Sequence, residues 1–206
     1  MTVAKGFSLS NPAEVLAGVL EQAKRPGAVV AFDLDSTLFD NRPRQAQILR
    51  DLGHRLGNAA LQGCRAEHFE SGWDVEGAVR RAGVPEQEAR ALDKDVRTFW
   101  RSWFFTSKYC ALDVEVPGAA RFLARLMGET KAKVVYVTGR HEGMREGSVE
   151  AFVARGMPRP DGDRVQLVMK PTLHENDDLF KLSAHKRLQA LGTVVAAFDN
   201  EPSHTN

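Results

Sequence analysis

Two acidic residues, Asp33 and Asp35, follow an apolar run and are separated only by Leu34. Successive side chains of an extended chain point to opposite faces, so both carboxylates are expected to leave the end of a strand on the same side. Two neighbouring anions need a cation, and proteins hold Mg²⁺ through one or two carboxylates together with waters and a substrate phosphate. The pair therefore indicates Mg²⁺-assisted chemistry on a phosphate group.

Three more polar groups occupy similar places later in the chain. The apolar run that begins at Lys133 ends in Thr138, and another that begins at Thr193 ends in Asp199. Between them, Lys181 lies near the start of an expected helix. A single pair of acids would be weak evidence, but polar groups that end successive strands together strongly indicate one site.

This order of acid pair, hydroxyl, lysine and third acid, over residues 29–201, resembles the haloacid dehalogenase-like (HAD) superfamily in its phosphatase branch. The resemblance implies that Asp33 attacks phosphorus to give an aspartyl phosphate. It implies that Asp35 protonates the leaving oxygen and then activates water. It also implies that Mg²⁺ is bound by Asp33, by Asp199 and by the backbone carbonyl of Asp35. Dehalogenating relatives lack the second acid, so Asp35 favours phosphoryl transfer.

An acid that protonates a leaving group must hold a proton near neutral pH, whereas the ordinary pKa of Asp is about 4. Burial and the like charge of Asp33 would both raise the pKa of Asp35. We therefore expect the pair to divide into an ionised nucleophile, Asp33, and a protonated acid, Asp35.

Residues beside the motifs are candidates for substrate binding. The hydroxyl of Thr138, followed by the closely approachable backbone of Gly139, suits a cradle for phosphate oxygens. Arg140 would extend this cradle or contact the rest of the substrate. Ser36 and Thr37, which follow the acid pair, are the remaining candidates.

Two lysines compete for the position of the third motif. Lys181 follows Glu175-Asn-Asp-Asp178, a typical start of a helix, whereas Lys170 ends an apolar strand before Pro171. We favour Lys181, with Lys186 as a third choice. In either case the cation would neutralise the nucleophile and the phosphoryl oxygens in the transition state.

The last motif departs from the family pattern. Relatives often carry paired acids or an acid four or five residues later, whereas here Asp199 is followed by Asn200 and Glu201. Whether Asn200 or Glu201 orients metal-bound water stays open. The sequence also stops at Asn206, without residues for the usual final helix and edge strand, which leaves a truncated or a minimal core as the alternatives.

The spacing of apolar residues predicts an α/β fold, a Rossmann-like parallel sheet core with helices on both faces plus an inserted helical cap subdomain. The core comprises residues 1–41 and 115–206. Residues 1–27 are its N-terminal helical segment, in which the helix begins at Asn11. Residues 42–114 form the insert, which shows helical spacing and no strand pattern. It resembles the family's C1 cap, a mobile lid that implies a small phosphorylated substrate. Asp40, Asn41 and Arg42 would form the hinge or a solvated turn.

Composition limits the remaining functions. The chain has 206 residues, is 43% hydrophobic and carries a formal net charge of only +1, so we expect one globular unit and no nucleic-acid binding. No apolar run is long enough for a membrane span or a signal peptide, and Cys64 and Cys110 lack metal-site spacing, which favours a cytoplasmic protein. The aromatic group of the insert is more typical of a core than of a ligand wall; it contains Trp100, Trp103, Phe104, Phe105 and Tyr109.

Other functions remain compatible with these motifs. A phosphotransferase or phosphomutase would use the same residues with another acceptor in place of water. A non-catalytic phosphate-binding or phospho-acceptor switch also combines acids, Thr and Lys on a parallel sheet. A receiver domain, however, places its acceptor acid on a middle strand and has no large helical insert. The substrate and the oligomeric state are not determined by the sequence.

Overall fold

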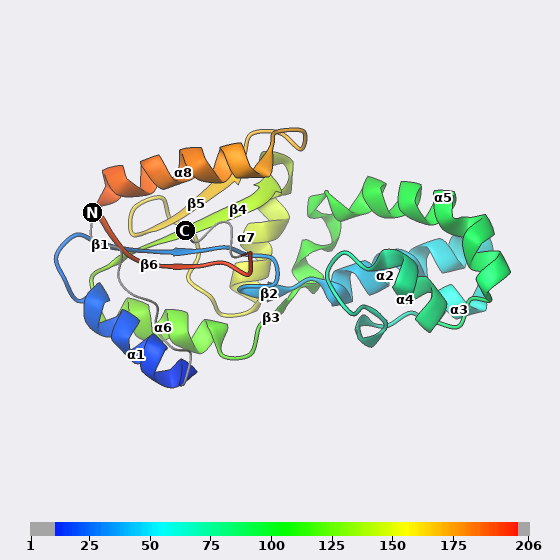
Figure 1. Ribbon diagram of the computed structural model, residues 1–206, viewed down its shortest axis with the longest axis horizontal. Helices are drawn as coiled ribbons and strands as arrows, with labels where there is room; N and C mark the ends of the chain where they lie inside the picture. The colour runs from blue at the N-terminus through cyan, green and yellow to red at the C-terminus, as the bar shows by residue number, and fades with distance from the viewer. Residues whose placement is uncertain (1–10, 202–206) are drawn as a thin grey trace.

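A parallel sheet forms the centre of the core in the computed structural model, which describes residues 11–201 (Figure 1). Within this range the sheet has the strand order β5-β4-β1-β6. The strands are β1 (Ala28–Phe32), β4 (Lys133–His141), β5 (Val165–Lys170) and β6 (Thr193–Phe198). All three pairings are parallel, as the alternation of helices and strands predicted. The expected α/β fold is confirmed.

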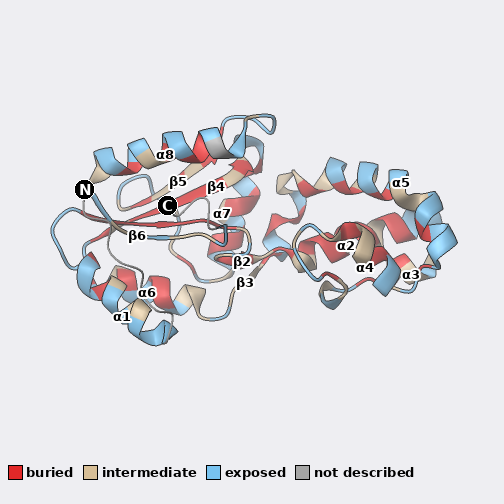
Figure 2. Cartoon of the chain, in the orientation of Figure 1, coloured by how far each residue is buried: buried red, intermediate tan, exposed pale blue. Residues whose placement is uncertain are grey.

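Alternate residues of the central strands face different helices. Val30 and Tyr136 belong to the larger core cluster, which the helices α1 (Pro12–Ala23), α6 (Ala119–Glu129) and α7 (Arg145–Ala154) complete. Val29 and Val135 point to the other face and pack against α8 (Asp177–Leu191). Both faces of β1 and β4 are therefore buried, and α8 lies on the side of the sheet opposite α1 and α6 (Figures 1 and 2). This burial requires apolar runs rather than polar alternation.

Side-chain caps fix where the helices begin. Asn11 accepts a hydrogen bond from the Ala13 backbone and precedes Pro12, as expected for the start of α1. Asn176 accepts one from the Leu179 backbone, so α8 begins at Asp177. Lys181 consequently lies just over one turn into α8, near the end of the helix that meets the sheet edge.

The insert has a hydrophobic core of its own. Its helices are α2 (Arg42–Leu56), α3 (Ala59–Gln62), α4 (Val75–Arg81) and α5 (Glu86–Phe104), with 3₁₀ turns η1 (Ala66–His68) and η2 (Ser107–Leu112). Figure 1 shows them as a lobe beside the sheet. Trp100, Phe104 and Tyr109 are buried in this lobe, as expected of core aromatics. Helix α5 ends at Phe104, where the chain turns into η2, so Tyr109 lies beyond this helix.

A short antiparallel ribbon joins the insert to the core. It consists of β2 (Phe39–Asp40) and β3 (Val114–Glu115), in which Phe39 pairs with Glu115. The sequence did not predict it, because two residues are too few to show alternation. The ribbon keeps the two chain crossings side by side.

Two segments lie outside the described residues. They are residues 1–10, in which a signal peptide was sought, and residues 202–206. Among the described helices, none combines the length and apolarity that crossing a bilayer requires. The short turn η3 (Glu142–Met144) completes the described elements between β4 and α7.

Candidate active site

Asp33, Lys181 and Asp199 form a chain of ion pairs at the carboxyl end of the sheet. Nζ of Lys181 lies 3.0 Å from Oδ1 of Asp33 and 2.5 Å from Oδ2 of Asp199. Asp33 follows β1 directly, Asp199 follows β6, and Lys181 reaches both from α8. Neighbouring parallel strands bring their ends together, so residues 33 and 199 meet although the sequence separates them widely.

Asp33 is a buried carboxylate with too little positive charge around it. Burial raises its pKa to about 7; Lys181 opposes this shift, whereas the negative charges of Asp35 and Asp199 add to it. One lysine therefore does not offset the burial and the two neighbouring acids. Further positive charge would be needed to keep Asp33 fully ionised at neutral pH.

Asp35 is bound by other cations than Asp33, and these cations change the expected order of the two pKa values. Its Oδ1 lies 2.6 Å from Nη2 of Arg140 and 3.3 Å from Nη2 of Arg44, and it also accepts a hydrogen bond from Asn41. Burial alone would raise the pKa of Asp35, but Arg140, Arg44 and Asn41 lower it below its ordinary value. The pKa of Asp35 therefore lies below that of Asp33, the opposite of the expected order, because the guanidinium groups outweigh the effects of burial and of Asp33.

Among protein cations, Asp33 thus pairs with Lys181, whereas Asp35 pairs with Arg140 and Arg44. Within residues 11–201, no three His, Cys, Asp or Glu side chains gather as a metal site. The carboxylates of Asp33 and Asp199 are the pair that could hold a metal ion. A contribution from Asp35 would come through its backbone carbonyl, as the family resemblance implies.

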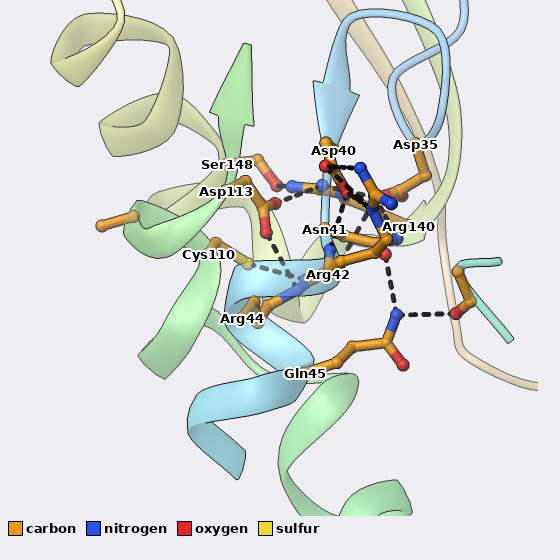
Figure 3. A network of polar contacts seen from close by, with 12 residues as sticks. Asp35, Asp40, Asn41, Arg42, Arg44, Gln45, Cys110, Asp113, Arg140 and Ser148 are labelled. Atoms are coloured by element: carbon orange, nitrogen blue, oxygen red, sulfur yellow. Dashed lines mark hydrogen bonds and ion pairs between the residues drawn. The ribbon is translucent and has the colours of Figure 1, made fainter. Parts of the chain in front are cut away.

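Arg140 lines the cavity, and its charged group is bonded within the protein. It is buried, and its Nε and Nη2 make two hydrogen bonds to the carboxylate of Asp35. Nη2 also bonds to Asp113, and Nη1 bonds to Ser148. These partners surround the guanidinium (Figure 3), and a contact of Arg140 with the phosphate or the rest of the substrate stays a prediction.

Thr138 and Gly139 line the cavity, and Gly139 has a packing role in addition to the predicted one. The buried Oγ1 of Thr138 accepts a hydrogen bond from the Arg140 backbone, and its hydroxyl remains a donor suited to an anion. A Cβ on Gly139 would lie 3.0 Å from Oδ1 of Asp177. The missing side chain thus accommodates Asp177 as well as leaving the backbone open to a ligand.

The turn after the acid pair separates Ser36 from Thr37. Ser36 has a φ of 65°, and among residues 11–201 it alone of the non-glycine residues has a positive φ. It lines the same cavity as Asp33. Thr37 lines a different groove, between Leu16 and Phe122, so its predicted contact with substrate is not supported.

The competing lysines have separate partners. Lys170 is buried at the end of β5, 2.7 Å from Oδ1 of Asp177, and it donates to the carbonyls of Leu173 and Glu175. It therefore holds the loop that leads to α8, whereas Lys181 contacts Asp33. Lys186 is exposed on α8.

A cavity of about 450 Å³ brings the core residues together with part of the insert. From the core it contains Asp33, Asp35, Thr138, Lys170, Lys181, Asn200 and Glu201. The insert adds Trp73, Arg101, Phe104 and Phe105, and the loop before α8 adds Leu173 and His174. Trp73 is 64% exposed and packs edge-on against Trp100. Of the aromatics predicted as core, Phe104 and Phe105 thus also form the cavity wall.

Sequence reasoning missed most of the insert's share of this cavity. Trp73 and Arg101 stand outside every motif, and no spacing signal marks them. Asn41 was expected at a hinge or a solvated turn, but it is buried and bonded to Asp35. After Asp199, the Glu201 backbone donates to Oδ1 of Asp199, which fixes that carboxylate from the C-terminal side.

Comparison with known proteins identifies the class of this site. The sequence profile of haloacid dehalogenase-like hydrolases matches residues 28–199, so the chain belongs to this family of hydrolases. No curated protein matches the sequence.

Solved structures share the fold. The class C acid phosphatase from Bacillus anthracis with tungstate bound has a TM-score of 0.53 and 14% identity, over 93% of this chain and 60% of that one. A hydrolase from Streptococcus pneumoniae TIGR4 has a TM-score of 0.49 and 12% identity, over 85% of this chain and 83% of that one. This chain therefore spans less than two thirds of the acid phosphatase, and at such identities the likeness concerns the fold alone.

Proposed function

We propose that this protein is a Mg²⁺-dependent phosphomonoester hydrolase that works through an aspartyl phosphate on Asp33. The observation that carries the proposal is the position of the Asp33 carboxylate. It lines the cavity beside the Lys181 ammonium, at the strand ends where Thr138 also lies. A carboxylate nucleophile, a fixed cation and a hydroxyl donor are the groups that phosphoryl transfer requires.

Two balanced displacements describe the reaction. A carboxylate oxygen of Asp33 forms a bond to phosphorus while the ester P–O bond breaks, and the departing oxygen takes up a proton from solvent. Water then attacks phosphorus, the bond to Asp33 breaks, and inorganic phosphate is released. Lys181 and Thr138 stabilise the phosphoryl oxygens in both steps.

The residues present fit a Mg²⁺ ion. Asp33 and Asp199 supply two carboxylates, a typical protein contribution to Mg²⁺ binding, and a bound cation would oppose the burial and the neighbouring acids that raise the pKa of Asp33. Asn200 and Glu201 line the same cavity and are proposed to hold water molecules around the ion. When bound, Mg²⁺ would neutralise the phosphate and keep Asp33 ionised, which lowers the barrier between two anions.

The insert is proposed to act as a cap over a small phosphorylated substrate. Trp73, Arg101 and Phe105 belong to the insert and line the same cavity as the catalytic carboxylate, so they are proposed to contact the leaving group rather than the phosphate. A cavity of about 450 Å³ suits a small metabolite.

Metal removal tests the proposal directly. Hydrolysis of p-nitrophenyl phosphate should fall to background after EDTA treatment and dialysis, because the uncompensated charge at Asp33 repels the phosphate dianion. Added Mg²⁺ should restore it, and Ca²⁺ at the same concentration should restore less, since Ca²⁺ prefers more ligands and longer distances. Undiminished turnover in protein shown to be metal-free by elemental analysis would contradict the mechanism.

The environment of Asp35 favours a base in the second displacement. Arg140 keeps this carboxylate ionised, and an ionised carboxylate can accept a proton from attacking water. Protonation of the leaving oxygen, the other role that the family resemblance implies, would require Asp35 to hold a proton before the first displacement, whereas a base binds the proton only during the second.

Replacing Asp35 by Asn separates these roles. We expect steady-state turnover to fall about 10²- to 10⁴-fold, with the first turnover of an aryl phosphate still fast, because only hydrolysis of the intermediate needs the base. Rapid-quench kinetics should show a burst of nitrophenol and phosphate trapped on the protein. Loss of the burst, together with a larger loss for alkyl than for aryl phosphates, would instead identify Asp35 as the acid for the leaving group.

A further inference from the structure

Asp113 lies at the centre of a buried cluster of ion pairs next to the cavity (Figure 3). Its side chain is 0% exposed, and each oxygen faces a different arginine. Oδ2 lies 2.6 Å from Nη2 of Arg140, and Oδ1 lies 3.1 Å from Nε of Arg44. Asp113 is outside the lining of the cavity, and neither the family motifs nor the proposed reaction gives it a part.

Both arginines that bind Asp113 continue to Asp35. Nη2 of Arg140 donates to Asp113 and to Asp35, and its Nε donates to the second oxygen of Asp35 at 2.9 Å. Nη2 of Arg44 lies 3.3 Å from the same Asp35 carboxylate. Two carboxylates and two guanidiniums balance in charge, so loss of one member leaves an uncompensated buried charge.

The guanidinium of Arg140 is fixed by more partners than Asp35 provides. Ser148 accepts from Nη1, and Asp113 accepts from Nη2, the nitrogen that also donates to Asp35. A planar guanidinium that is held at several nitrogens presents a rigid fork to a carboxylate. Without Asp113 the guanidinium of Arg140 could rotate more freely. The Asp35 carboxylate, which is bonded to that guanidinium, would move with it.

The cluster also spans the junction between the two lobes. Asp35 and Arg140 belong to the core, whereas Arg44 lies in the first turn of α2 and Asp113 directly precedes β3. Pairing of β2 with β3 holds these two crossings together. A second chain of hydrogen bonds runs in the same direction, from Asp35 through Asn41 to Gln45 of α2.

We infer that Asp113 is a positioning residue, which fixes the direction of the Asp35 carboxylate through Arg140. The inference rests on the proposed function, since it gives Asp35 a part in hydrolysis of the aspartyl phosphate. Asp113 itself touches neither substrate nor the reacting atoms. Its removal should therefore impair the step that uses Asp35 and leave substrate binding and attack by Asp33 nearly unchanged.

The test compares Asp113→Asn with Asp51→Asn, using p-nitrophenyl phosphate and Mg²⁺. Asp51 is a matched control, because its carboxylate also belongs to the insert and accepts a hydrogen bond, from Tyr109, but does not contact the cluster. For Asp113→Asn we expect the steady-state kcat to fall about 10²-fold through misplacement of Asp35. The ratio kcat/KM should change less than about threefold, so KM should fall together with kcat, and the first-turnover burst should persist. Asp51→Asn should stay within about threefold of the wild type in every parameter.

A second variant covers the case in which Asp113→Asn is poorly folded. Combining it with Arg44→Met removes one positive and one negative charge, so the remaining Asp35 and Arg140 are balanced, and the Met stem can still pack on Phe104. We expect the melting temperature to recover in this double variant while kcat stays low and the burst persists.

Recovery of kcat together with the melting temperature would overturn the inference, as would a burst reduced in proportion to turnover. Either result would make Asp113 a residue of the fold alone. Failure of the proposed function is recognised separately, because the wild type and Asp51→Asn would then also lack turnover and trapped phosphate.

Discussion

Replacing Asp33 by Asn should abolish phosphatase turnover, with a loss of at least ~10⁴-fold, because the amide cannot form the acyl phosphate. Stability should not fall. Burial raises the pKa of Asp33 to about 7, so its ionisation at neutral pH costs folding free energy, which a neutral amide avoids. Lys181 also keeps its contact with Asp199 in this variant. We therefore expect an inactive protein whose melting temperature is equal to or above that of the wild type.

Covalent labelling provides the direct measurement for this variant. Beryllium fluoride with Mg²⁺ mimics a phosphoryl group on a carboxylate, and fluorine NMR should detect its complex with the wild type but not with Asp33→Asn. Asp35→Asn is the matched control, since it has the same substitution two residues away and retains the accepting carboxylate. A beryllium fluoride signal that survives Asp33→Asn would place the nucleophile elsewhere.

Replacing Lys181 by Ala should lower turnover by ~10²- to 10³-fold at saturating substrate, the usual cost of losing one group that stabilises transition-state charge. Asp33 and Asp199 would then face each other without the ammonium that lies 3.0 Å and 2.5 Å from them. Added Mg²⁺ should bind no more weakly, because a competing cation has gone. Steady-state kinetics over a range of Mg²⁺ concentrations measures both effects.

Two other lysines serve as comparisons. Lys170→Ala should reduce turnover less, by about tenfold or under, but should lower the melting temperature, since Lys170 binds Asp177 and two carbonyls of its loop. Lys186→Ala, an exposed change on the same helix as Lys181, should leave both unchanged. A severe catalytic loss in Lys170→Ala beside near-normal Lys181→Ala would assign the third-motif role to Lys170.

The sequence determined the scaffold and the identity of its main chemical groups. Apolar runs that end in Asp33, Thr138 and Asp199 are visible in the sequence. The strands β1 and β4 need continuous apolar side chains because both their faces are buried, whereas the edge strand β6 is apolar but partly exposed. Parallel pairing then carries these ends to one edge. The position of Lys181 beside Asp33 could be anticipated in the same way, since the Asn176 cap sets the start of its helix.

The tertiary structure decided which charge meets which. Arg140 stands next to a phosphate-binding motif in sequence. Its guanidinium nevertheless bonds to Asp35, which is 105 residues away, and to Asp113. No local pattern encodes that choice, because a buried charge takes the partner that packing brings within reach, and its desolvation makes the pairing compulsory.

The insert shows the same division. Helical spacing predicted its helices, but not that Trp73 and Arg101 would face the catalytic edge of the sheet. Their placement depends on the β2–β3 ribbon and on the cluster around Asp113, which set how the second lobe meets the first. The amino-acid pattern thus specifies each lobe from its own periodicity, whereas the cavity between them arises from contacts made across the whole chain.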